Sequence, residues 1–459
     1  SDGRSRGVSL PHLAVFFLVI IASATSSVSP SYHGYKWVRF NADGGVARWL
    51  EQLQEYAFDI DERTSERRIL VDVFSEPTKL QPWADVLVAP DFYDVFRSLL
   101  KRQGVLEVEV LRSNFQRVID SELQDIEETR ERRRRRKRQN NMNNNSIAFD
   151  DENYHSYDQM VTFMRDLTAR FPHIATLANV STSFEGRTIY GVKISSSHTF
   201  KPAIVIDAGV HAREWIAPAA AVYILKKLVT SYGRDARLTR AVDAFDWHII
   251  PQVNPDGYEY SMWTDRLWRK TRSHNSSANK WCIGADANRN WGYRWGEAGA
   301  NRAPCSNIYQ GSAPFSEKEI VGLKEYMTWR IPNLVIYLSL HAYGQVFLSP
   351  WGYTSKRPEN YVDQRNAASA AVQAMKRLTG VNYNFGTISE VMYPASGTSI
   401  DFMQSRSVPF IYGVELRPAD TRGAVAFAIP PSNIKPTGDE LLEGALAIAD
   451  YYQHHKGSG

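Results

Sequence analysis

Three separate apolar stretches each end in a side chain that can bind a metal ion or move a proton. The run 203–206 leads to His211 and, three residues later, to Glu214. The stretch "VIYLSLH" ends at His341, and "FIYGVE" ends at Glu415. Because sites in α/β sheets form beyond the carboxyl ends of the strands, we expect these four side chains to meet at one site.

The donor types at this predicted site indicate metal-assisted chemistry. Two imidazoles and one carboxylate form a known shell for catalytic zinc, which leaves a fourth position for water. Zinc would lower the pKa of that water and polarise a carbonyl, and Glu415 is available to take the proton. Each motif alone is weak, since a His-x-x-Glu pair arises by chance in about every second chain of this kind. His341 could be a structural histidine and Glu415 the partner of an arginine, so only the combination carries the hypothesis.

Arginine and asparagine are concentrated in two segments, "RLWRKTR" (266–272) and "DANRNW" (286–291). Arginine is well suited to bidentate recognition of a carboxylate. The alternative is a solvated basic surface, but Trp268 and Trp291 are interleaved with the charges, which is unusual for such a surface. The two segments are therefore candidates for binding an anionic group.

The length of 459 residues predicts two or three domains, and 43% apolar residues allow a large core. The net charge of +4 is small, so no nucleic-acid partner is expected. At the N-terminus, Arg4 and Arg6 precede the apolar run 13–22 and the small residues 23–27. This pattern predicts a signal peptide over residues 1–28 and a secreted protein, with an uncleaved anchor as the alternative.

Two cysteines, Cys282 and Cys305, are present. In a secreted chain an even pair indicates one disulfide, which here would stabilise the fold by about 3 kcal/mol. Two free buried thiols are the alternative.

The clearest boundary in the sequence is the charge run "RERRRRRKR" (130–138), followed by an Asn-rich stretch. Such a run is not expected to pack. In a secreted protein it is best interpreted as an exposed linker that a protease cuts in or after residues 132–138. A nuclear signal or nucleic-acid patch is the alternative.

The segments on the two sides of the basic run differ in pattern. The upstream segment has the β-α-β-β-α-β order of a ferredoxin-like fold, followed by a helix that enters the basic run. An RNA-binding module of that fold is the alternative, but the segment carries no aromatic motif of the RNA-binding kind. Its predicted strands are 35–40, 68–74, 84–90 and 105–111, and its predicted helices are 46–55 and 91–102.

From about residue 150, near-continuous apolar strands alternate with helices. This pattern predicts an α/β layered domain whose sheet is buried on both faces. The predicted strands are 202–209, 245–253, 333–340 and 409–416, and the predicted helices are 158–172 and 218–232.

Seven motifs in order resemble those of the zinc carboxypeptidases of the pancreatic A/B type. They are "GVHAREW", "NPDGYEY", "RLWRKTR", "DANRNW", "SLHAYGQ", "YPASGTSID" and "VELR". The segment 31–138 resembles the activation propeptide of that family. The resemblance implies a mixed central sheet flanked by helices, preceded by a small ferredoxin-like α+β prodomain. The implied parts are a propeptide domain (31–112), a connecting helix with the cleavage site (113–138) and a catalytic domain (150–456).

The resemblance also implies a role for each matching residue. His211, Glu214 and His341 would bind one Zn²⁺, Glu415 would be the general base, and Arg269 would stabilise the oxyanion. The free C-terminal carboxylate of a peptide or protein substrate would be held by Asn288, Arg289 and Tyr393. The remaining implied roles are the lining of the cleft for upstream peptide residues, by Arg213, Tyr343 and Phe427, and the orientation of His211, by Asp286.

Substrate preference in this family follows the position seven residues after the equivalent of Tyr393, here Ile400. An Ile there, with Gly352 and Ile388 nearby, predicts a pocket for apolar or aromatic C-terminal residues, because an unpaired Lys or Arg would be costly to bury. Two other pocket positions, Thr398 and Gly413, differ from the expected Gly and Thr.

The hypothesis is therefore a secreted, monomeric zymogen of an A-type zinc carboxypeptidase, activated by a protease that cuts at the basic run. A B-type enzyme for C-terminal Lys or Arg is one alternative. An inactive family member that acts as a binding module is the other.

Overall fold

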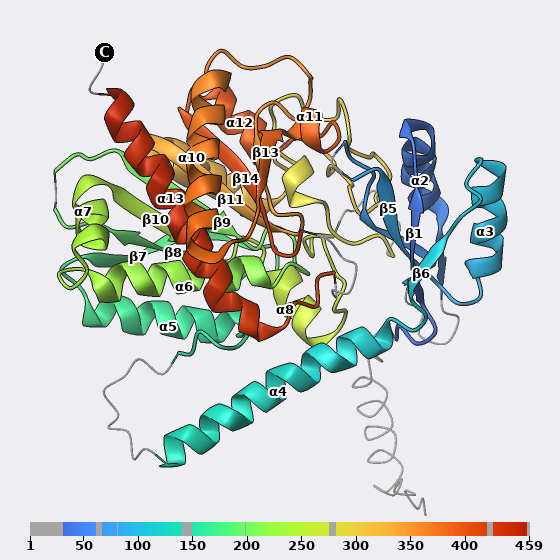
Figure 1. The fold of residues 1–459 in the computed structure, drawn as a ribbon, viewed down its shortest axis with the longest axis horizontal. Helices are drawn as coiled ribbons and strands as arrows, with labels where there is room; N and C mark the ends of the chain where they lie inside the picture. The colour runs from blue at the N-terminus through green and yellow to red at the C-terminus, as the bar shows by residue number, and fades with distance from the viewer. Residues whose placement is uncertain are drawn as a thin grey trace, which may run out of the picture.

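The computed structural model describes residues 31–60, 67–79, 81–139, 149–197, 199–274, 281–419 and 426–456. The predicted signal peptide lies outside these ranges. A large α/β unit and a small N-terminal unit lie side by side, and one long helix, α4, runs beneath both (Figure 1). None of the helices in the described ranges combines the length and the apolar character that a membrane span requires.

The small unit is a four-stranded antiparallel sheet with strand order β4-β5-β1-β6. This order and the two helices are those of a ferredoxin-like fold, as the sequence predicts. The predicted strand 68–74 is divided into β3 and β4, β2 was not predicted, and the last strand begins four residues later than expected. The elements are β1 (Lys36–Asn41), α2 (Gly44–Tyr56), β2 (Phe58–Ile60), β3 (Arg67–Ile69), β4 (Val71–Ser75), β5 (Trp83–Val88), α3 (Tyr93–Arg102) and β6 (Glu109–Arg112).

The large unit is built on an eight-stranded mixed sheet with strand order β13-β12-β14-β11-β9-β10-β8-β7. Its four central strands are parallel, and the outer pairs β8–β10, β7–β8 and β12–β14 are antiparallel. All residues of the central strands β9 and β11 are buried, which explains their continuous apolar sequences. The strands are β7 (Ala175–Thr182), β8 (Thr188–Ile194), β9 (Ala203–Ala208), β10 (Asp246–Ile250), β11 (Leu334–Ala342), β12 (Val346–Ser349), β13 (Asn384–Thr387) and β14 (Phe410–Leu416).

Helices cover the sheet on both faces. α5, α6, α10 and α13 pack on one face around the largest apolar cluster, while α9 and α12 contribute to a second cluster on the other. The predicted helices 158–172 and 218–232 are confirmed as α5 and α6. The helices are α5 (Tyr157–Arg170), α6 (Ile216–Ser231), α7 (Ala236–Ala244), α8 (Pro255–Trp263), α9 (Lys318–Glu325), α10 (Tyr361–Thr379), α11 (Ile388–Val391), α12 (Ser399–Ser405) and α13 (Ile434–Lys456).

The connecting helix α4 (Gln116–Gln139) includes the basic run; a helix was expected over 113–138, with the run itself unpacked. The helix persists because acidic side chains one turn earlier compensate the charges, as in the pair Arg135–Glu131 at 3.3 Å. Arg133 forms an ion pair with Asp150 of the large unit. The expectation that this run makes no contact with a folded unit was therefore wrong at Arg133, whereas Glu131, Arg132, Arg134 and Arg135 are exposed.

Candidate metal centre and active site

Three buried side chains at the end of the central sheet form a potential metal site. The Nδ1 atom of His211 lies 2.8 Å from Oε1 of Glu214, and the Nδ1 atom of His341 lies 3.2 Å from that of His211. The Nδ1 atom of His341 is 3.3 Å from Oε2 of Glu214. One ligand atom from each residue lies within 4.8 Å of the others.

Strand pairing explains why residues 130 positions apart meet here. β9 and β11 are parallel neighbours, with Ala208 beside Leu340, so the residues that come after these two positions lie at the same edge of the sheet. Directly after β9, Gly209 adopts a φ of +72°, and a Cβ there would lie 2.0 Å from the side chain of Gln252. Only glycine suits this turn, which brings His211 back over the edge of the sheet.

The residues present fit a zinc ion. The Nε2 atom of His211 lies 3.1 Å from Oδ1 of Asp286, and since a carboxylate only accepts, Nε2 carries the proton and Nδ1 is left for a metal. Burial alone would raise the pKa of Glu214, but His211 and His341 outweigh it and hold that pKa well below its usual value. An ionised carboxylate and two imidazole nitrogens are ligands that zinc prefers.

Glu415 lies beside this cluster because β14 pairs in parallel with β11, in a register that places Glu415 next to His341. Burial raises the pKa of the Glu415 carboxyl to about 7; Glu214 adds to the rise, while His341 and Arg269 oppose it. A carboxyl with a pKa near neutrality is suited to accept and then return a proton.

All twelve residues predicted from the sequence as catalytic, metal-binding or substrate-binding line one cavity of about 120 Å³. They come from loops and strand ends far apart in the chain, and the fold brings every one of them together. Within the cavity wall, Arg269 donates to Oδ2 of Asp286 at 2.8 Å, and Arg289 donates to the carbonyl of Gly299 at 2.6 Å. The Oδ1 atom of Asn288 accepts from the backbone N–H of Ser399, so its amide N–H groups remain as its donors.

One wall of the cavity is apolar and includes Ile388, Leu348 and Ile400. A Cβ at Gly413 would lie 3.7 Å from Cγ1 of Ile400, so the absence of a side chain there leaves open space beside Ile400. Of the described residues that line the cavity, the acids are Glu76, Glu214 and Glu415 alone; Glu76 belongs to the small unit, Glu214 to the metal cluster, and Glu415 lies next to His341.

The small unit also reaches into the cavity, through residues that no sequence pattern predicts. The segment 73–76 lines it, and Arg213 donates to Oδ2 of Asp72 at 2.8 Å. Burial raises the pKa of Glu76 to about 7, against the opposing pull of Arg289 and Arg269. No spacing rule could have found these contacts, because each joins residues that lie far apart in the sequence, 141 positions in the case of Arg213 and Asp72.

Aromatic side chains complete the contact between the two units. The guanidinium of Arg213 lies 4.2 Å from the ring centre of Phe427, and the rings of Phe74 and Phe427 pack edge to face at 5.5 Å. Tyr343 also packs against Phe427, with ring centres 5.2 Å apart. The three residues predicted to line the cleft for upstream peptide residues are therefore covered by the small unit.

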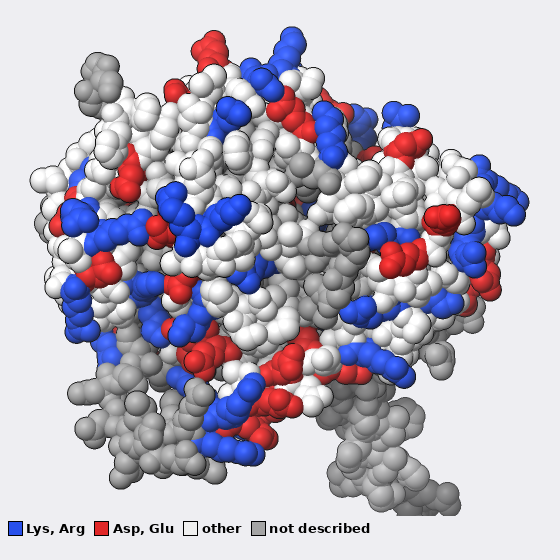
Figure 2. Space-filling view, in the orientation of Figure 1, with Lys and Arg blue, Asp and Glu red and all other residues white. Residues whose placement is uncertain are grey.

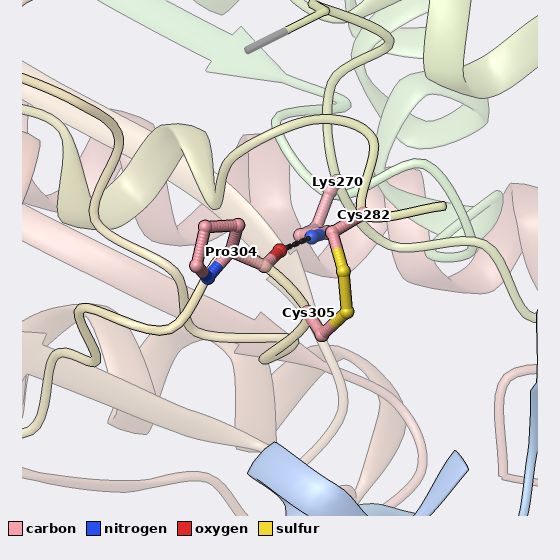
Figure 3. Close-up of a disulfide and its surroundings, with 4 residues drawn as sticks. All are labelled: Lys270, Cys282, Pro304 and Cys305. Atoms are coloured by element: carbon pink, nitrogen blue, oxygen red, sulfur yellow. Dashed lines mark hydrogen bonds between the residues drawn. A yellow bond between two sulfur atoms is a disulfide. The ribbon is translucent and has the colours of Figure 1, made fainter. Parts of the chain in front are cut away.

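The disulfide between Cys282 and Cys305 is present and confirms the predicted pairing. Figure 3 shows it beside Lys270, whose ammonium donates to the carbonyl of Pro304 at 2.7 Å. Together these two links close the loop that carries Asp286 and Arg289.

Comparisons with known proteins agree with this geometry. The model of the zinc carboxypeptidase family matches residues 160–444, and that of the carboxypeptidase activation peptide matches residues 59–122. Zinc carboxypeptidase A 1 of Drosophila melanogaster is 33% identical over 439 residues, which span 94% of this chain and 95% of the relative. Carboxypeptidase B of Astacus astacus is 38% identical over 300 residues, which span 65% of this chain and 97% of the relative.

Two solved structures resemble the whole chain. The crystal structure of carboxypeptidase A from Helicoverpa armigera superposes with a TM-score of 0.79, at 26% identity, and covers 92% of this chain and 98% of the other. That of thrombin activatable fibrinolysis inhibitor superposes with a TM-score of 0.75, at 25% identity and the same coverage.

The fold and the site together define a zinc-dependent hydrolase with a covered active site. The chain belongs to the zinc carboxypeptidase family and carries that family's activation peptide, so it is the zymogen of a metallocarboxypeptidase.

Proposed function

We propose that the activated enzyme removes single apolar or aromatic residues from the C-termini of peptides and proteins. The observation that carries this proposal is the apolar wall around Ile400, which has no described acid to pair with a basic side chain. Relatives named carboxypeptidase A and carboxypeptidase B are both similar to this chain, so only the pocket distinguishes the two preferences.

The proposed mechanism assigns one task to each group at the site. His211, Glu214 and His341 hold the metal, which when bound lowers the pKa of water and polarises the scissile carbonyl. Glu415 accepts the proton of the attacking water and passes it to the leaving amine. Arg269, held in place by Asp286, donates to the oxygen that becomes negative in the transition state.

A second group of residues restricts the reaction to chain ends. Asn288, Arg289 and Tyr393 line the same cavity as the apolar wall and supply donors for a free carboxylate. A peptide with no free carboxylate at that place would leave these donors unpaired, which costs binding energy. Arg213, Tyr343 and Phe427 contact the residues upstream of the scissile bond.

The small unit is proposed to keep the enzyme inactive by occupying this upstream part of the cleft. Asp72 forms an ion pair with Arg213, the arginine that would contact the peptide. The Oδ1 atom of Asp72 also accepts from the side chain of Asn307 at 2.7 Å. The proposed organisation has a signal peptide (1–28), a propeptide domain (31–112), a connecting helix with the cleavage site (113–138) and a catalytic domain (150–456). The protein is proposed to be a secreted monomer that a protease activates after the run 132–138.

Hydrolysis of matched peptides that differ only in the last residue tests the preference. The chain is cut at the basic run, and kcat/KM is measured for peptides ending in Phe, Leu, Lys and Arg. We expect Phe and Leu to be released at least about tenfold faster than Lys or Arg. Faster release of Arg would favour the B-type alternative. A cut, zinc-loaded chain that releases none of the four would favour an inactive binding module.

A further inference from the structure

A row of buried polar side chains lies directly beneath the metal site. Tyr337, Ser339 and His341 alternate along β11 and therefore point to the same face of the sheet. Asp207 on the neighbouring strand β9 is the register partner of Ser339. Asp207, Tyr337 and Ser339 are all 0% exposed, so each of their polar atoms needs a partner within the protein.

The hydrogen bonds of this row form one connected chain. The carboxylate of Asp207 accepts from the Tyr337 hydroxyl at its Oδ2 atom, at 2.6 Å, and from the Ser339 hydroxyl at its Oδ1 atom, at 2.7 Å. The Ser339 Oγ atom lies 3.3 Å from the Nε2 atom of His341. The chain therefore leads from a buried carboxylate through a serine to a metal-site histidine.

The direction of the hydrogen bond between Ser339 and His341 follows from the single proton of the serine hydroxyl. A hydroxyl has one proton, and Ser339 donates it to Asp207, which as a carboxylate can only accept. Towards His341, Ser339 can then only accept, so the Nε2 atom of His341 must carry the proton. The Nδ1 atom is left with its lone pair, and it is Nδ1 that faces Nδ1 of His211 and the carboxylate of Glu214.

We propose that Ser339 and Asp207 are positioning residues that hold His341 in the tautomer and ring orientation that bind zinc. His211 has a direct carboxylate partner in Asp286, whereas for His341 the carboxylate acts through a serine hydroxyl. Asp207 also belongs to the strand that leads to His211, so the chain joins the two strands that deliver the histidine ligands. The inference concerns metal binding and does not depend on the proposed substrate preference.

The main test is zinc affinity, measured on the full uncut chain by competition with a chelator. In Ser339→Ala, the Nε2–H of His341 loses its acceptor in a buried site, and we expect the zinc Kd to rise about 10- to 100-fold. Tyr337→Phe keeps the Ser339–His341 contact and removes only the second donor to Asp207, so we expect a smaller rise in Kd.

Tyr412→Phe is the matched control. Its hydroxyl is also buried and donates to the carbonyl of Gln364 at 2.6 Å, but the residue neighbours Leu338 in register and points to the other face of the sheet. It should lower the thermal midpoint of the zinc-free chain and leave the zinc Kd unchanged. If Ser339→Ala behaves like Tyr412→Phe, with a lower midpoint and an unchanged Kd, the proposal is overturned.

A second measurement needs no variant and applies if Ser339→Ala does not fold. In the zinc-loaded wild-type chain with ¹⁵N-labelled histidine, NMR shows which ring nitrogen carries the proton. We expect His341 to be protonated at Nε2, with that proton protected from exchange by its hydrogen bond. A proton on Nδ1, or an Nε2 proton that exchanges as rapidly as that of the exposed His454, would overturn the proposal.

Discussion

Two polar side chains at the cavity, His211 and Arg269, are oriented by one partner behind them, Asp286. Asp286 accepts from both of them and is itself 0% exposed. The pKa of its carboxyl lies well below the usual value, since the nearby Arg269 and His211 outweigh the effect of burial. One ionised group thus orients both a metal ligand and the group proposed to stabilise the oxyanion.

Glu415→Gln tests the general base. The amide has nearly the same shape but cannot accept a proton from water, so we expect kcat of the cut enzyme to fall about 10²- to 10⁴-fold with zinc content unchanged. Metal analysis and peptide hydrolysis are measured on the same sample. A base must be ionised, so wild-type kcat/KM should decrease as the pH falls through the pKa of Glu415. If the residual activity of Glu415→Gln shows the same decrease in kcat/KM at low pH, the decrease must come from the titration of another group.

Gly413→Thr tests the depth of the pocket. A Cβ is tolerated beside Ile400, and the γ atoms of threonine would fill the space beyond it. We expect kcat/KM for peptides ending in Trp to fall about tenfold or more, with a smaller change for peptides ending in Val. Thr398→Gly in the same cavity is the opposite change. It removes the side chain whose hydroxyl caps α12 and frees space in the pocket. A variant with both Gly413→Thr and Thr398→Gly should therefore recover part of the lost kcat/KM for peptides ending in Trp.

At the scale of elements, the strands that could be predicted from the sequence are those whose residues are nearly all buried. β9, β11 and β14 are buried throughout or nearly so, so their apolar runs and the polar residues at their ends could be recognised. The edge strand β7 alternates irregularly between buried and exposed positions and was not predicted. The candidate site could be predicted because each possible metal ligand, and the proposed general base Glu415, lies at or just after the end of such a recognisable segment.

The contacts between the two units could not be predicted in the same way. Arg266 makes a bidentate ion pair with Glu122 of α4, and both side chains are buried. Their sequence separation is 144 residues, and neither lies in a pattern that names its partner. Such pairs depend on how the surfaces of two folded units fit together, and the sequence around each residue does not specify that fit.

Glu122→Ala tests whether α4 holds the small unit on the cleft. The change leaves the buried guanidinium of Arg266 without its carboxylate, and losing one member of a buried pair is strongly destabilising. A loss of about 1.4 kcal/mol in the closed arrangement would raise the open fraction about tenfold. We therefore expect the uncut chain to hydrolyse a small peptide about tenfold faster than the wild type.

The matched control for this change is Glu128→Ala in the same helix. The Glu128 side chain is exposed and accepts from the side chain of Gln124, also within α4, so its loss should leave the closed arrangement intact. Equal hydrolysis rates for the uncut Glu122→Ala and Glu128→Ala chains would contradict the prediction.

At the scale of the whole molecule, buried carboxyls make stability depend on pH. Burial raises the pKa of Glu319 to about 7; Glu317 and Asp256 add to the rise, while the backbone N–H of Phe184 opposes it. Because the folded pKa is higher than the unfolded one, this group's contribution is fully present below about pH 4.5 and is lost as the pH rises through about 7.

Glu319→Gln should therefore reduce the loss of stability on going from pH 5 to pH 8, by about 1–2 kcal/mol. The thermal midpoint of the full chain at the two pH values measures this effect. Glu325→Gln in the same helix is the control, since its side chain is 57% exposed and should not change the pH dependence. If the difference between the thermal midpoints at pH 5 and pH 8 is the same in Glu319→Gln as in the wild type, this carboxyl does not titrate between those pH values.

The helical conformation of the basic run affects how readily a protease could cut it. Figure 2 shows acidic and then basic side chains along α4 at the lower edge of the molecule, in the direction that leads away from the small unit. Its later turns are also fastened to the large unit, since Asn153 donates to the carbonyl of Ile126 at 3.1 Å and Asp150 binds Arg133. Proteolysis of a folded segment proceeds through its locally opened form. If the proposed cleavage falls in this run, the lifetime of the zymogen would depend on how often the end of α4 unwinds, as well as on how many arginines the protease recognises.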